Sequence, residues 1–284
     1  MKTLFFMIMM AGALCACGHR ASQTEGTTGA DSTVTDSAPI AIENIIEVET
    51  VSFEKNDSTA EVSLLIQWPT KGEKAIVDSL QQFIGELVGS KIGSPQAIEA
   101  YGESLFKILS DEWHGVYDEM EPDDRLGAFS KTHDVTFPDQ TDSYITLFYH
   151  TFDYGGGAHG YTTEVGFTFR KSDGKQLGEQ IPLLTDTDSP KFAQMLKEGV
   201  RSFFSDGTEP MSDEELLEYL FAEEVESLDN LPLPGNHPYF TKTGVVFLYT
   251  QYEIGPYSSG IIRFEVPFND ILPYLTPEAQ ALIE

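Results

Sequence analysis

The sequence predicts an α+β protein, with mixed or antiparallel sheets packed against helices in two interlocked subdomains. Two observations predict this class. Segments of alternating apolar and polar residues, typical of strands, stand beside segments whose apolar residues recur at helical spacing. Over residues 44–184 the predicted order is β-β-α-α-β-β-β-β, and a second mixture of helices and strands follows over residues 188–284.

The chain divides into four segments by composition. These are a lipoprotein signal peptide (1–17), a flexible tether (18–42), an N-terminal α+β subdomain (43–170) and a C-terminal α+β subdomain (171–284). The tether is rich in Ser, Thr, Gly and Ala, so it lacks the apolar surface that a folded core requires. The two subdomains together are long enough for a sizeable core.

The first segment has the pattern of an export signal. Lys2 precedes an uncharged apolar run, residues 4–14, that is too short to span a bilayer as a helix. Cys15-Ala16-Cys17 then resembles the end of a bacterial lipobox, in which the thiol of Cys17 would carry the lipid. The alternative is an ordinary secretory signal with two incidental cysteines. We therefore expect an extracytoplasmic protein, anchored by lipid to a bacterial membrane, with no cysteine left for a disulfide.

The net charge of the chain limits the classes of partner that it can bind. It has 17 basic and 46 acidic residues, a formal net charge of −29. Nucleic acids and anionic lipid headgroups are therefore poor partners, whereas a cation or a cationic protein would be attracted. The simpler alternative is that the charge keeps the protein soluble in a crowded envelope.

The N-terminal elements follow from apolar spacing and turn residues. Strands are predicted at residues 44–55, 59–68, 128–138, 143–154, 161–170 and 176–184, and helices at 71–88 and 95–117. The turn at residues 56–58 makes the first two strands a hairpin, which Pro69 is expected to end. Ser94 and Pro95 have the pattern of an N-cap followed by a first-turn proline. Residues 172–175 indicate a tight turn.

The C-terminal elements are marked mainly by capping residues. Helix starts are predicted at Ser189-Pro190, at a capping box of Ser212 and Glu215, at Pro267 and at Thr276-Pro277. Strand-like sequence covers residues 239–253, interrupted by a turn at Thr243-Gly244, and residues 261–266. Residues 244–249 are apolar on both faces, which predicts a central strand.

A glycine-rich stretch interrupts the alternation between two predicted strands. It runs from Tyr154 through Gly156 and His159 to Tyr161. So much glycine predicts positive φ angles at a bend or bulge. His159 could then be a metal ligand or a general base, or it could hydrogen-bond the backbone of the bend. Because no second His, Cys, Asp or Glu pair stands at ligand spacing, we expect no metal, no cofactor and no assigned catalytic residue.

A second irregular loop, residues 253–260, follows the predicted central strand. Tyr252, Glu253, Pro256 and Tyr257 could present aromatic rings and a carboxylate to a sugar or a protein. Alternatively, the two tyrosines could fasten the loop to its own sheet. Glu253 with Asp153 would make a carboxylate pair suited to glycosidic chemistry if the fold brought them together.

Two stretches carry a family resemblance. One is residues 154–160 followed by a strand and the turn at 172–175; the other runs from Tyr239-Phe240 through residues 252–260 to Val266-Pro267-Phe268 and Ile271. Together they resemble the paired domains of unknown function found in RsiV-type anti-sigma ectodomains and ahead of the catalytic domain in some peptidoglycan deacetylases. The resemblance covers roughly residues 44–275 and implies an extracytoplasmic α+β body in two subdomains. In the RsiV-type members this body binds lysozyme. No transmembrane helix, sigma-binding segment or deacetylase domain is recognised in this sequence, so those activities are not expected to transfer.

The sequence thus leads to three hypotheses about function. The first is a non-catalytic binding module at the cell envelope, which would use residues 155–160 and 253–260 to bind a wall glycan or a cationic wall-active protein such as lysozyme. The second is a metal-assisted or acid–base hydrolase of cell-wall material that uses His159 and nearby carboxylates. The third is a structural envelope protein.

Overall fold

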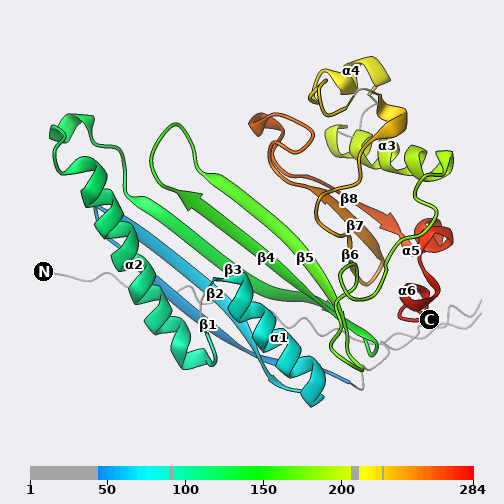
Figure 1. The fold of residues 1–284 in the computed structure, drawn as a ribbon, viewed down its shortest axis with the longest axis horizontal. Helices are drawn as coiled ribbons and strands as arrows, with labels where there is room; N and C mark the ends of the chain where they lie inside the picture. Colours follow the sequence, from blue (N-terminus) through cyan, green and yellow to red (C-terminus); the bar gives the residue numbers. More distant parts are fainter. Residues whose placement is uncertain (1–43, 90–91, 206–210, 226) are drawn as a thin grey trace, which may run out of the picture. The chain divides into compact units, whose positions relative to one another are not determined.

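The protein is described here by a computed structural model, which describes residues 44–89, 92–205, 211–225 and 227–284. The predicted signal peptide, Cys17 and the tether lie outside the described residues. The α+β prediction is confirmed, because the described residues form two sheets and six α-helices (Figure 1).

The first sheet has five strands in the order β1-β2-β3-β4-β5. Their bounds are β1 Glu47–Asn56, β2 Ala60–Lys71, β3 Phe129–Gln140, β4 Tyr144–Tyr154 and β5 Tyr161–Arg170. All neighbouring pairs are antiparallel except β2 and β3, which are parallel. A parallel pair requires a crossover connection, and the two helices α1 (Lys74–Leu87) and α2 (Pro95–Tyr117) supply it.

Both helices lie across one face of this sheet (Figure 1). The alternation predicted for β2 is confirmed, since Val62, Leu64 and Ile66 are all buried beneath the helices. Ser94 occupies the N-cap of α2 as predicted, but its side chain makes no capping hydrogen bond. The helices therefore owe their position to the apolar face that they bury rather than to their caps.

Two sequence predictions are wrong in this region. Pro69 does not end β2, which continues to Lys71. The parallel pairing with β3 stops at Ile66, so the missing N–H of Pro69 costs no hydrogen bond on that side. Residues 176–184 do not form a strand but make only isolated bridges, with a positive φ of 88° at Gly178.

The second sheet has the order β6-β7-β8. The elements of this region are α3 (Pro190–Phe204), α4 (Asp213–Leu217), β6 (Tyr239–Phe240), β7 (Gly244–Tyr249), β8 (Ile262–Pro267), α5 (Phe268–Ile271) and α6 (Pro277–Gln280). Every residue of β7 is buried and it pairs on both sides, so the predicted central strand is confirmed. The caps predicted at Ser189, Ser212 with Glu215, and Thr276 are all formed.

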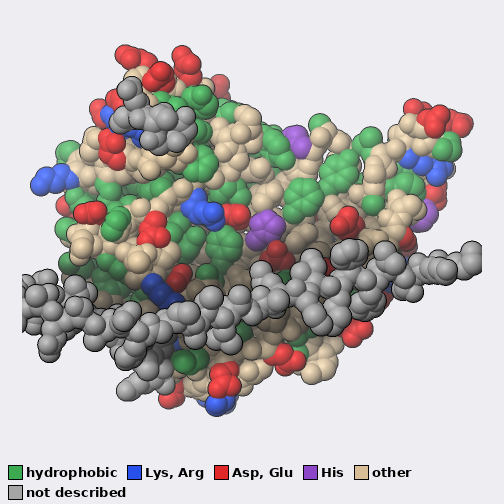
Figure 2. Space-filling view, turned by 180° about the vertical axis from the view of Figure 1, so that it is seen from behind, with side chains coloured by type: hydrophobic (Ala, Val, Ile, Leu, Met, Phe, Trp, Pro, Cys, Tyr) green, Lys and Arg blue, Asp and Glu red, His purple; other side chains and the backbone are tan. Residues whose placement is uncertain are grey.

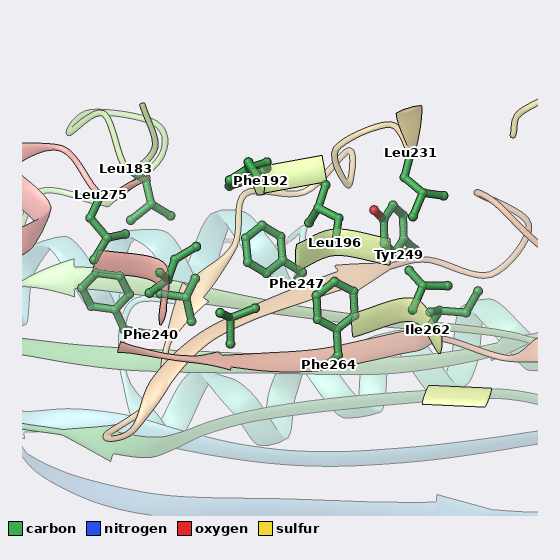
Figure 3. Packing of buried hydrophobic residues seen from close by; sticks show 14 of the residues in the cluster. Leu183, Phe192, Leu196, Leu231, Phe240, Phe247, Tyr249, Ile262, Phe264 and Leu275 are labelled. Carbon is green, nitrogen blue, oxygen red and sulfur yellow. The ribbon is translucent and has the colours of Figure 1, made fainter. Parts of the chain in front are cut away.

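The second core lies between α3 and this sheet. Phe192 and Leu196 of α3 face Phe247 of β7, which stacks on Phe264 of β8 with ring centres 5.5 Å apart (Figure 3). Segments without regular structure complete the core through Leu183 and Leu231.

Buried hydroxyl groups join the two sheets. The Thr168 hydroxyl accepts a hydrogen bond from the Phe240 N–H at 2.8 Å, and the Thr146 hydroxyl donates to the Phe240 carbonyl at 2.7 Å. The two hydroxyls lie 3.0 Å apart. Tyr144 of β4 also donates to the carbonyl of Thr241 and belongs to the second core. The described residues accordingly fall in one compact unit, and none of their helices is both long and apolar enough to cross a membrane.

Candidate binding site

The glycine-rich stretch forms the connection between β4 and β5. Gly156 and Gly157 have φ angles of 92° and 98°, which confirms the predicted positive φ. The Tyr154 hydroxyl donates to the carbonyl of Gly157 at 3.1 Å and closes the bend. Gly160 lies against the ring of Phe152, where a Cβ atom would come within 2.3 Å of the ring. The bend therefore requires glycine both for its backbone angles and for its close approach to the sheet.

His159 is exposed at the end of this bend and contacts the second predicted loop. Its Nδ1 lies 3.0 Å from the carbonyl of Gly160, to which it donates. In the neutral ring Nε2 is then the acceptor, and the Tyr252 hydroxyl lies 3.3 Å from it. The imidazole also stacks on Tyr257, with ring centres 3.8 Å apart and planes inclined by 23°. We call His159, Tyr252 and Tyr257 the aromatic cluster.

Tyr252 holds an unusual backbone conformation within the aromatic cluster. Its φ is 66°, and its side chain is among the exposed large hydrophobic groups, with 46% of its area accessible. A non-glycine residue in this left-handed region costs about 1–2 kcal/mol. Such strain persists only where the surroundings impose it, and it is concentrated at functional sites.

Glu253, the next residue, makes hydrogen bonds on both sides of this turn. Its Oε1 accepts from the Gly235 N–H at 2.6 Å, and its Oε2 accepts from the N–H and the hydroxyl of Thr250. The carboxylate therefore fastens the turn after β7 to residues 231–238. Asp153 has different partners, an ion pair with Lys131 and a contact with Thr151. The structure thus places the two members of the predicted carboxylate pair in separate hydrogen-bonding networks.

The other predicted site residues lie on the same two connections or at their ends. Tyr161 begins β5 and is 41% exposed. Pro256 precedes a short 3₁₀ helix, Tyr257–Ser259, which presents the Tyr257 ring to His159. Gly156 packs beside the Tyr117 hydroxyl at the end of α2.

Gln251 is a positioning residue that the sequence did not reveal. It is buried, and its Oε1 accepts a hydrogen bond from the Thr162 N–H at 2.9 Å. This bond ties the turn after β7 to the start of β5 and so fixes the two halves of the aromatic cluster. A lone glutamine in an irregular loop carries no sequence signal for such a role.

Two further histidines lie in other surroundings. Nδ1 of His150 lies 3.3 Å from a carboxylate oxygen of Asp134 on the adjacent strand β3. His133 is buried under the helices, where its Nδ1 and the Tyr149 hydroxyl are hydrogen-bonded at 2.5 Å. Burial lowers the pKa of His133 to about 4 and raises the pKa of Tyr149 to about 12. Among the described residues, no three His, Cys, Asp or Glu side chains converge as metal ligands would.

Comparisons with known proteins show the fold, and one domain family matches part of the chain. Residues 185–269 match the family described as "Protein of unknown function (DUF3298)". This match includes Tyr252 and Tyr257 but not the glycine bend. No functionally curated protein matches the chain.

Two solved structures are similar over most of their length. A DUF3298-family protein from Bacteroides fragilis has a TM-score of 0.68 and 17% identity, covering 86% of this chain and 99% of its own. One from Pseudomonas aeruginosa PAO1 has a TM-score of 0.56 and 14% identity, covering 84% and 98%. At these identities the likeness shows the fold alone. The chain therefore carries a DUF3298 match at residues 185–269 within a fold that DUF3298 proteins share.

Proposed function

We propose that this protein is a non-catalytic binding module of the bacterial cell envelope, and that it binds a wall glycan at the aromatic cluster. The observation that carries the proposal is the convergence of His159 and Tyr252, which are 93 residues apart in the sequence. A buried glutamine, a structural carboxylate and a strained backbone hold three rings together at the surface.

The chemistry of the aromatic cluster suits a sugar. Aromatic rings cover the apolar faces of pyranose rings, while phenol and imidazole groups can hydrogen-bond the hydroxyls at their edges. Tyr252 and Tyr161 already expose apolar area that water solvates poorly. Their contact with a glycan would remove that area from water.

A cationic wall-active protein such as lysozyme is the second candidate ligand. The net charge of −29 favours it, and acidic side chains are spread around the face seen in Figure 2. The resemblance to RsiV-type ectodomains, which bind lysozyme, points the same way. The negative electrostatic field of these acidic side chains would raise the association rate with a basic partner, and salt would weaken this effect.

The proposal includes a lipid anchor on Cys17. It is supported by the lipobox-like sequence at residues 14–17. Replacing Cys17 with Ala should move the protein from the membrane fraction to the soluble exported fraction and abolish labelling by a radioactive fatty acid. Retention of the label in the variant would contradict the anchor.

The binding test uses the exported chain with insoluble peptidoglycan and, separately, with immobilised basic lysozyme. We expect Tyr252→Ala and Tyr257→Ala each to weaken retention on peptidoglycan at least fivefold, about the loss of one good aromatic contact. Leu272→Ala removes a similarly exposed apolar side chain elsewhere and should change nothing. Glycan binding should persist in high salt, whereas lysozyme binding should weaken.

Equal retention of the tyrosine variants and the wild type would refute the site. Retention of folded protein on neither matrix at either salt concentration would refute both ligands. The hydrolase alternative would need a carboxylate beside His159, whereas Asp153 and Glu253 each bond to other groups.

A further inference from the structure

A second concave site lies in the C-terminal region, apart from the aromatic cluster. It is a cavity of about 570 Å³ between the start of α3 and residues 229–233. Sites for small molecules typically measure roughly 300–1,000 Å³. The accessible apolar residues of its lining are Pro190, Ala193 and Leu233. The other apolar lining residues, Phe192, Leu196 and Leu231, are almost fully buried members of the second core, and Figure 3 labels them.

The far wall of this cavity is held in place by hydrogen bonds. The Lys197 ammonium donates to Asp229 at 3.0 Å and to Asp213 at 2.6 Å. The Tyr249 hydroxyl donates to the carbonyl of Pro232 at 2.8 Å. Residues 229–233 are thus fixed from α3 on one side and from β7 on the other. The cavity is therefore part of the folded structure and does not need a ligand to form it.

The polar lining of the cavity indicates the charge of its ligand. Among the described residues that line it, the charged members are Asp188 and Asp229, and none is Lys, Arg or His. Asp229 forms an ion pair with Lys197, and its side chain is nevertheless 80% exposed. Thr187 and Asn230 add neutral polar groups at the rim. An anion would meet two carboxylates here, whereas a cation would be attracted to them.

The accessible apolar part of the lining indicates the rest of the ligand. Phe192 and Leu196 are almost completely buried, so this part comes from Pro190, Ala193 and Leu233, of which Leu233 is 43% exposed. An aliphatic or aromatic group against these residues would bury the exposed part of Leu233 and displace water from an apolar surface.

We propose that this cavity binds a small amphipathic cation, an apolar chain or ring that carries a primary amine or a guanidinium. The apolar part lies against Ala193 and Leu233, and the cation lies near Asp188 and Asp229. The ligand can be a free amine or a Lys or Arg side chain of a peptide, since both present the same chemistry. This site is independent of the proposed glycan site.

The direct test is an NMR titration with hexylamine, hexanol and hexanoate, which share a chain and differ in charge. We expect hexylamine, below about 10 mM, to shift the methyl resonances of Ala193, Leu196, Leu231 and Leu233. Hexanol should need at least tenfold more, and hexanoate should leave these resonances unchanged. Equal shifts with all three compounds, or shifts only outside the cavity, would overturn the proposal.

Three variants sharpen the titration. Asp188→Asn should weaken hexylamine binding at least threefold, whereas Glu49→Gln, which removes one exposed carboxylate from β1, should not. Ala193→Phe should fill the cavity and abolish binding. If circular dichroism shows that Ala193→Phe does not fold, the comparison of Asp188→Asn with Glu49→Gln tests the site. Equal affinity of these two variants for hexylamine would overturn the proposal.

A final arm distinguishes the two sources of the cation. N-acetyl-lysine amide and N-acetyl-arginine amide carry the side chains without a free α-amine. Shifts of the cavity methyls by these compounds, at concentrations near those of hexylamine, identify a basic side chain of a peptide as the ligand. Binding of hexylamine alone identifies a free amine.

Discussion

The five-stranded and three-stranded regions of this protein are built in different ways. Strands β1 to β5 are 10–12 residues long, and their core comes almost entirely from strands and helices. Strands β6 to β8 have only 2–6 residues, and irregular segments supply Leu183, Leu231 and Ile254 to their core. The aromatic cluster lies where a bend of the first region meets a turn of the second. Regular structure thus provides the scaffold, and irregular structure provides the surface that can recognise a ligand.

The largest expected effect tests whether the two regions fold as one. Phe247→Ala removes a fully buried ring from the second core and should lower the free energy of unfolding by about 3–5 kcal/mol. Both tryptophans, Trp68 and Trp113, belong to the first core. If the regions are coupled, urea unfolding followed by tryptophan fluorescence should shift as far as unfolding followed by circular dichroism. A fluorescence transition that stays in place would show that the regions unfold separately.

The next effect is confined to the first region and depends on pH. The pKa of His133 is about 4 in the folded protein and about 6.5 in the unfolded chain. Between these values the unfolded chain binds more protons, so stability is full above pH 6.5 and falls as the pH drops toward 4. The expected loss is about 3 kcal/mol.

Carboxylates with lowered pKa values, such as Asp57 and Asp173, add their own acid sensitivity. The measurement is therefore the difference in unfolding free energy between wild type and His133→Asn from pH 7 to pH 4. This difference should shrink as the pH falls. A constant difference across the range would show that His133 does not titrate as its burial implies.

A smaller effect probes the junction of the two regions. Thr168→Val leaves the buried N–H of Phe240 without its acceptor and should cost about 1–3 kcal/mol. Thr163→Val, at a half-buried position of the same strand, should stay within about 0.5 kcal/mol of wild type. Equal stabilities of the two variants in urea would mean that the junction does not depend on this hydrogen bond.

The smallest effect separates stability from binding at the aromatic cluster. Asn adopts the left-handed conformation more readily than Tyr, so Tyr252→Asn should gain up to about 1 kcal/mol in stability. The same variant should bind peptidoglycan more weakly. A variant that binds as well as wild type would show that the strain at Tyr252 serves no binding role.

The contrast between the regions also explains what the sequence could predict. The strands of the first sheet and the helices α1 and α2 follow from local periodicity, and the helix caps at Ser189, Ser212 and Thr276 follow from local chemistry. The predicted strand at residues 176–184 failed because Gly178 and Pro182 interrupt pairing, and the ring of His237 occupies the space beside Gly178. The alternation of apolar and polar residues cannot predict a contact with a residue that is distant in the sequence, such as His237.

The same limit applies to the candidate site, where the sequence indicates the local features but not the contacts between distant segments. The run of glycines predicts the positive φ angles of Gly156 and Gly157, and their composition distinguishes the loops at residues 155–160 and 253–260. The stacking of His159 on Tyr257, the fastening by Gln251 and the use of Glu253 as a backbone acceptor all depend on contacts between distant segments. No local pattern encodes them.

The parallel pairing of β2 with β3 has a consequence for the order of folding. Ala60 pairs with Phe129, and both helices lie between them in the sequence. As the chain emerges, the β1–β2 hairpin can form early, but one edge of β2 stays open until the whole crossover has followed. An open edge invites pairing with other chains, and contacts of such long range close slowly. Docking of α1 covers the face of the hairpin, so this edge of β2 is closed only when β3 pairs with it.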